Sequence, residues 1–163
     1  MASRPQQLYD DDFYAWTRDQ AQALRRMAEQ RWNGPLDLEH LAEEVEDLGS
    51  ERQWAVMSQL ERIIEHLLKI EHSTSPAPRR QWMLSVNNAR REIRRRITAT
   101  IRLEVEPALA ELYDAGRRDA ELGLLDYGER EAAKALPATC PYAFDDLLAD
   151  AWWPANRHGL TDD

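Results

Sequence analysis

Two helix-forming stretches that meet at a glycine constrain the fold of this chain more than any other feature. Over residues 37–48, and again over residues 50–70, apolar side chains recur every three or four positions, the period of an α-helix with one buried face. Gly49 is typical of a helix end, and Ser50 with Gln53 forms a capping box that can begin a new helix. The sequence therefore predicts a tight corner between two helices at Gly49.

A separate helix is expected before this pair. Three consecutive carboxylates at residues 10–12 can cap its first amides, and the Asn-Gly-Pro sequence at residues 33–35 should end it near Arg31. The spacing of the large apolar residues predicts that its buried stripe consists of Phe13, Trp16, Leu24 and Met27.

Two further helices and a C-terminal tail complete the expected fold. The helices should span residues 79–102 and 106–123, the second with a proline in its first turn. Residues 128–163 combine three prolines with aromatic and leucine side chains, and no segment of the chain alternates like a β-strand. We therefore predict a single all-α domain over residues 1–163, a bundle of about five main helices with the tail packed across it.

Charge limits the partners that the chain can bind. The 163 residues carry a formal net charge of −9, which disfavours nucleic acids and anionic membranes as partners of the whole chain. The charge is uneven, because residues 1–75 carry 8 Lys and Arg against 15 Asp and Glu, residues 76–102 carry 8 against 1, and residues 103–163 carry 5 against 14. A single cysteine, no signal peptide and no membrane-spanning stretch predict a cytoplasmic protein.

Five short segments carry a resemblance to a bacterial protein family. They include Leu-Ala-Glu-Glu-Val-Glu-Asp-Leu-Gly-Ser-Glu at 41–51 and His-Leu-Leu-Lys at 66–69, and the others are residues 9–16, 90–93 and 139–142. In this order and spacing, the chain resembles the family catalogued as domain of unknown function twenty-nine. The resemblance implies an all-α fold over nearly the whole chain. It implies no activity, substrate or cofactor, because none is agreed for the family.

Glu44 and His66 are the candidate metal ligands. Each borders the apolar arc of its predicted helix, so the two side chains could converge at the edge of the bundle. However, the Glu-x-x-His pairs of di-iron bundles and the His-Glu-x-x-His motif of zinc enzymes are both absent. The alternative is that both residues are hydrogen-bonded or solvated flanks of their helices. No motif in the chain implies a cofactor.

Two nucleophilic or acid–base alternatives use other residues. Arg62 and His66 could act together on a phosphodiester, although Arg62 falls on the solvent side of the helical wheel. Cys140 lies in a Thr-Cys-Pro-Tyr sequence, which is typical of a turn with a small buried side chain rather than of a reactive thiol.

The arginine-rich segment 79–102 is the strongest functional hint. It contains eight arginines, and Arg91, Arg95 and Arg102 should lie opposite its apolar face, where they could bind nucleic-acid phosphates. The alternative is that the arginines are neutralised by the acidic helices on either side. Aromatic residues, which a single-strand binder would interleave with its basic ones, are absent apart from Trp82.

A non-enzymatic interaction module is the leading interpretation, because no residue spacing meets the requirements of a known catalytic site. The partner would be another protein or a second copy of the chain, bound on the helical surface or on the tail near Trp152 and Trp153. The competing interpretations are a metal-assisted hydrolase or nuclease using Glu44, His66 and Arg91, and nucleic-acid binding through the arginine-rich segment.

Overall fold

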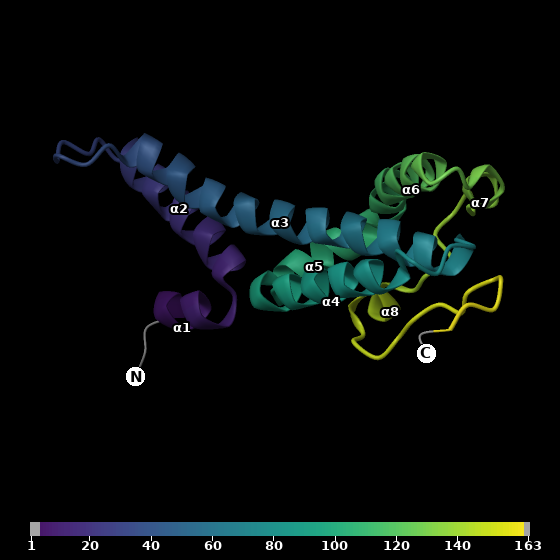
Figure 1. Ribbon diagram of the computed structural model, residues 1–163. Coiled ribbons are helices and arrows are strands. Elements are labelled where there is room, and N and C mark those ends of the chain that lie inside the picture. Colours follow the sequence, from purple (N-terminus) through teal and green to yellow (C-terminus); the bar gives the residue numbers. More distant parts are fainter. Residues whose placement is uncertain (1–3, 162–163) are drawn as a thin grey trace. The chain divides into compact units, whose positions relative to one another are not determined.

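All regular structure in residues 4–161, the part of the chain that the computed structural model describes, is helical (Figure 1). The predicted all-α fold is confirmed. The helices are α1 (Arg4–Asp11), α2 (Phe13–Glu29), α3 (Leu38–His72), α4 (Arg79–Arg96), α5 (Ala99–Val105), α6 (Leu109–Asp126), α7 (Arg130–Lys134) and α8 (Phe144–Leu148), with a 3₁₀ turn, η1, over Glu106–Ala108.

The chain divides into two compact units. Unit 1 consists of Met1–Ala55 and Arg96–Val105, and unit 2 of Val56–Arg95 and Glu106–Asp163. Helix α3 contributes its first half to unit 1 and its second half to unit 2. That the two units associate as a single domain, as the sequence leads us to expect, stays a prediction.

The corner predicted at Gly49 does not form, because α3 continues unbroken from Leu38 to His72. Gly49 is buried against α2, and a Cβ atom built there would lie 2.2 Å from Oγ1 of Thr17. The glycine therefore permits close packing of two helices rather than ending one. Gln53 does not form the predicted capping box, because its side-chain amide donates a hydrogen bond to Glu104 at 2.6 Å. Glycine and glutamine occur both at helix ends and in contacts between helices, so the sequence alone favoured a helix end where the structure has a helix contact.

The helix predicted to begin at the acidic run is α2, and a further helix that the sequence did not predict, α1, ends just before Asp12. This residue has φ −150° and ψ 86°, and its carboxylate accepts hydrogen bonds from the amides of Ala15 at 2.9 Å and Thr100 at 3.0 Å. Burial raises the pKa of Asp12, but these hydrogen bonds outweigh it and the pKa is lowered overall. The predicted N-cap is thus confirmed, and it also ties α2 to the start of α5.

The helix predicted over residues 79–102 ends at Arg96. Thr98 then caps α5, because its hydroxyl accepts a hydrogen bond from the amide of Ile101 at 3.2 Å. The helix predicted over residues 106–123 corresponds to α6, which continues past Gly123 to Asp126.

Unit 2 contains the larger apolar core, and the second half of α3 is its centre. Seven of its side chains are fully buried: Val56, Leu60, Ile63, Ile64, Leu67, Leu68 and Ile70. Around them pack Trp82, Val86 and Ile93 of α4, Leu112 and Tyr113 of α6, and Phe144 and Leu147 of α8. The broad apolar arc of this part of the sequence correctly predicted a central helix.

The tail after α7 is fastened to α4 by Arg90, whose side chain is buried. Its guanidinium donates to backbone carbonyls rather than to the carboxylates expected from the sequence, namely those of Leu147 at 3.0 Å, Trp152 at 3.0 Å, Asp146 at 3.3 Å and Asp150 at 3.4 Å. Arg94 forms an ion pair with the Asp150 side chain. The expected packing of the tail across helices is confirmed within unit 2, and residues 128–163 contain two short helices, α7 and α8.

Replacing Gly116 by alanine is expected to destabilise the protein by about 1–3 kcal/mol, because overpacking a tight helix contact forces backbone shifts. A Cβ atom at Gly116 would lie 2.7 Å from the backbone oxygen of Glu61 and 2.9 Å from Cβ of Ile64. Leu122→Ala on the same helix is the control, since Leu122 is 62% exposed and its truncation adds no atom to a helix contact. Urea unfolding should show the loss in the first variant, and a stability within about 1 kcal/mol of wild type in the second.

Candidate interaction surface and the predicted site residues

The two candidate metal ligands are not brought together. Glu44 and His66 lie 22 residues apart on the unbroken helix α3, which at the helical rise corresponds to about 33 Å along its axis. One ion therefore cannot contact both side chains. Within residues 4–161, no group of three or more His, Cys, Asp and Glu side chains is arranged to hold a metal ion.

His66 belongs to a local cluster on α3. Its Nδ1 atom lies 3.4 Å from Oε2 of Glu65, and the same carboxylate forms an ion pair with Lys69 one turn later. The ammonium of Lys69 lies 5.9 Å from the ring centroid of Trp82. Arg62, the partner of His66 in the nuclease hypothesis, is exposed to solvent. The surroundings of His66 are thus those of a packed ion-pair cluster.

The three arginines proposed to bind phosphates lie on two helices. Arg91 and Arg95 are exposed on α4, where Arg91 donates to Asn88 and Arg95 pairs with Glu92 at 2.9 Å. Arg102 is half-buried on α5. The helix predicted over residues 79–102 thus ends between Arg95 and Arg102, and these two arginines belong to different units. Nucleic-acid binding by the exposed pair stays a prediction.

Cys140 is half-buried, and burial raises the pKa of its thiol. Its Sγ atom lies 3.4 Å from the carbonyl oxygen of Tyr142, within the tail. A raised thiol pKa lowers the fraction of nucleophilic thiolate at neutral pH.

In unit 1, α2 and the first half of α3 form an antiparallel hairpin with a narrow buried seam. Small residues make much of this seam, which consists of Tyr14, Thr17 and Ala21 on α2 and Leu38, Ala42 and Gly49 on α3. An ion pair between Arg25 and Glu46, with a distance of 2.6 Å, also joins the two helices. The small seam residues allow a close approach and leave the larger apolar side chains to one side.

The apolar stripe predicted to be buried on the first helix is therefore only partly covered. Phe13, Trp16 and Leu24 are half-buried, and Met27 is 42% exposed. Helix α3 carries a matching stripe of Leu41, Val45 and Leu48, which follow one another by four and three residues. Leu41 is 40% exposed, Leu48 is 50% exposed and Val45 is half-buried. A helical wheel places both stripes on the same side of the antiparallel pair.

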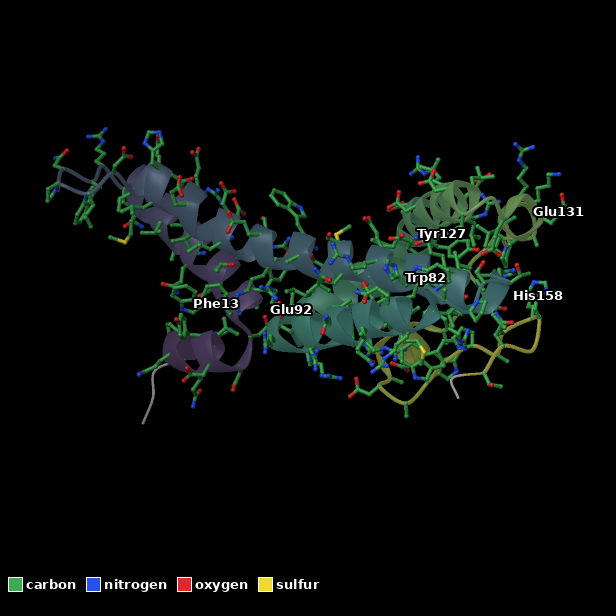
Figure 2. All side chains as sticks on the ribbon, viewed as in Figure 1. Phe13, Trp82, Glu92, Tyr127, Glu131 and His158 are labelled. Carbon is green, nitrogen blue, oxygen red and sulfur yellow. The ribbon has the colours of Figure 1, made fainter. Side chains whose placement is uncertain are left out.

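An aromatic cluster closes one end of this surface. The ring centroids of Tyr9, Phe13 and Trp16 lie 4.9–5.6 Å apart, and the guanidinium of Arg52 lies 4.1 Å from the centroid of Phe13 (Figure 2 labels Phe13). Arg52 lies one turn after Leu48 on α3, so its contact with Phe13 of α2 joins the two stripes. We refer to Phe13, Trp16, Leu24 and Met27 together with Leu41, Val45, Leu48 and Arg52 as the hairpin face.

Comparison with known proteins identifies the family. The model described as "Domain of unknown function DUF29" matches residues 8–153. The chain belongs to the DUF29 family. Among solved structures, it is similar to an α-helical protein of unknown function from Rhodospirillum rubrum ATCC 11170, with a TM-score of 0.77 and 23% sequence identity over 88% of this chain and 90% of that one. At this identity the similarity shows the fold alone, and no curated protein matches the chain.

The segments that carried the family resemblance have distinct places in this DUF29 protein. Residues 9–16 supply the aromatic cluster and the Asp12 cap, and residues 41–51 supply the α3 side of the hairpin face. Residues 66–69, 90–93 and 139–142 all lie in unit 2. No helix in the described part of the DUF29 chain is long and apolar enough to cross a membrane.

Sequence reasoning missed the hairpin face as a candidate site. Its α2 stripe was recognised, but as core. The available signal was the run of small residues at positions 17, 21, 42 and 49, which marks a closely packed seam beside the large apolar side chains.

Proposed function

We propose that this DUF29 protein is a non-enzymatic, self-associating interaction module, in which the hairpin faces of two copies pack together as a four-helix bundle. The observation that carries the proposal is the position of the two half-exposed apolar stripes on one side of an antiparallel helix pair. Two helices alone enclose little core, and pairing with a second hairpin is the usual way to bury such stripes.

Charge supports a second copy as the occupant. Residues 13–31 of the hairpin contain 4 arginines against 2 acidic residues, whereas residues 37–55 contain 1 arginine against 7 acidic residues. In a two-fold arrangement, α2 of one copy can lie against α3 of the other, so that a basic edge meets an acidic edge twice. The aromatic cluster with Arg52 supplies residue types that dominate the binding energy of many interfaces.

The test is the mass of the purified protein in solution, measured by analytical ultracentrifugation. We expect wild type to sediment with about twice the chain mass of 19.0 kDa at micromolar concentrations. Leu48→Glu should weaken association about a hundredfold or more, because a two-fold interface contains the substitution twice.

The matched control is Leu122→Glu, which alters a leucine of α6 that is 62% exposed and lies outside the hairpin face. It should leave the dimer unchanged, and circular dichroism should show the same helix content in both variants. A monomeric wild type at about 100 μM, or equal dimerisation of the two variants, would contradict the proposal.

We also propose the cytoplasm as its place of action. The support is compositional, since the chain has a single cysteine and so no intramolecular disulfide.

A further inference from the structure

A pocket of about 500 Å³ lies where α3 ends in unit 2. Residues of the α3 end, of α7 and of the tail line it, among them His72, Thr74, Glu129, Arg130, Arg157 and His158. Figure 2 labels His158 and Glu131, two of its lining residues, at the same end of the unit. The volume is within the usual range for small-molecule sites, about 300–1,000 Å³.

One wall of this pocket contains a polar atom without a partner. His72 is 1% exposed, and its Nε2 atom finds no hydrogen-bond partner in the described part of the chain. The closest charged group is Oε1 of Glu71, at 3.9 Å. Burial lowers the pKa of His72, so its imidazole is neutral at pH 7. Buried polar atoms are almost always paired in folded proteins, and His72 lines the pocket, so its Nε2 atom can pair with a polar group bound there.

The carboxylates at the pocket are already compensated by the protein. Glu71 accepts hydrogen bonds from the Tyr142 hydroxyl at 2.6 Å and from Nε of Arg157 at 3.2 Å. Glu129 accepts from the Ser73 hydroxyl at 2.5 Å and the Thr74 amide at 2.7 Å, and these bonds outweigh its burial and lower its pKa. Glu131, the remaining carboxylate of the pocket, pairs with Lys134 at 3.1 Å. Each of these carboxylates therefore has a partner within the protein.

Two guanidinium groups remain available on the rim. The contact of Arg157 with Glu71 uses Nε, and its side chain is 57% exposed. Arg130 is exposed at the start of α7, and within residues 4–161 its guanidinium has no hydrogen bond or ion pair. Guanidinium groups bind phosphate and carboxylate oxygens in a forked geometry.

The tail is positioned to hold this site together. The amide of Asn156 donates to the carbonyls of Ile70 at 2.8 Å and Ser73 at 2.9 Å, and Nε2 of His158 donates to the carbonyl of His72 at 3.1 Å. These bonds fix Arg157 and His158 beside the end of α3, so the pocket is preorganised.

We propose that this pocket binds a small organic anion, whose phosphate or carboxylate group contacts Arg130 and Arg157 while a second polar group pairs with Nε2 of His72. The proposal is independent of self-association, because every residue that it uses lies in unit 2.

The test is histidine-ring NMR of the full chain titrated with inorganic phosphate and, separately, with succinate. We expect either anion to shift the ring resonances of His72 and His158 with a dissociation constant near the millimolar range, and Arg130→Gln to weaken binding roughly tenfold. Arg130 has no internal partner, so this variant should fold normally. The matched control is Arg118→Gln on α6, which should bind like wild type.

Binding of only one of the two anions would support the site and identify the group that it prefers. The proposal is overturned if neither anion shifts the two rings at about 20 mM, or if the affinity is unchanged in Arg130→Gln. Binding that Arg118→Gln weakens as much as Arg130→Gln would also overturn it, since the anion would then be attracted by charge alone.

Discussion

Arg90→Met is expected to lower the free energy of unfolding by about 3–5 kcal/mol, because removing one partner of a buried charged network leaves the other groups unpaired. The guanidinium is 1% exposed and donates to four backbone carbonyls of the segment 146–152. Methionine fills a similar volume but donates no hydrogen bond. Urea unfolding, together with amide hydrogen exchange of residues 146–152, would measure both the stability and the release of the tail.

Two further variants separate charge from geometry at this position. Arg90→Lys keeps the charge, but one ammonium cannot reach four carbonyls, so most of the loss should remain. Arg91→Met removes the neighbouring exposed arginine and should change the stability by less than about 0.5 kcal/mol. A stability of Arg90→Met within about 1 kcal/mol of wild type would mean that Arg90 does not hold the tail.

Glu65→Gln is expected to lower the stability by about 3 kcal/mol at pH 7 and by little at pH 2. Burial raises the pKa of Glu65, but the neighbouring His66 and Lys69 outweigh burial and lower the pKa to about 2, from an ordinary 4.5. A carboxyl with a lowered pKa in the folded state stabilises the protein fully above its unfolded pKa. This contribution disappears as the pH falls from about 5 to about 2.

Chemical denaturation at pH 7, 4 and 2.5 would measure this dependence. Glu61→Gln, one turn earlier on α3, is the matched control, because burial and the nearby Asp119 raise the pKa of Glu61 rather than lowering it. That variant should therefore lose no stability at pH 7. Parallel stability curves for wild type and Glu65→Gln across this pH range would refute the stabilising role of the Glu65 charge.

Helix content, the central position of the second half of α3 and the cap at Asp12 could all be predicted from the sequence. These features depend on the spacing of apolar residues and on local hydrogen bonding, both of which are properties of neighbouring positions. The same holds for the family, because segments such as residues 41–51 keep their order along the chain.

The anion pocket and the burial of Arg90 could not be predicted in this way. His72 reads as one more residue at the end of a helix, and only the folded tail brings Arg157 and His158 beside it. Arg90 likewise reads as part of a basic surface segment. In the structure it is buried under carbonyls of the tail, such as those of Leu147 and Trp152, which come 57 and 62 residues later in the chain. Contacts between residues so far apart leave no periodic signal in the sequence.

The sequence by itself determined that this DUF29 chain is helical and which side chains can share a helix face. Only the tertiary structure decided which of those faces are buried. Gly49 and Thr17 show the physical reason: small side chains let α2 and α3 approach closely along one seam, and the larger apolar stripe beside that seam stays half-exposed. That choice depends on how closely two backbones can approach, a distance that residue spacing along one helix does not encode.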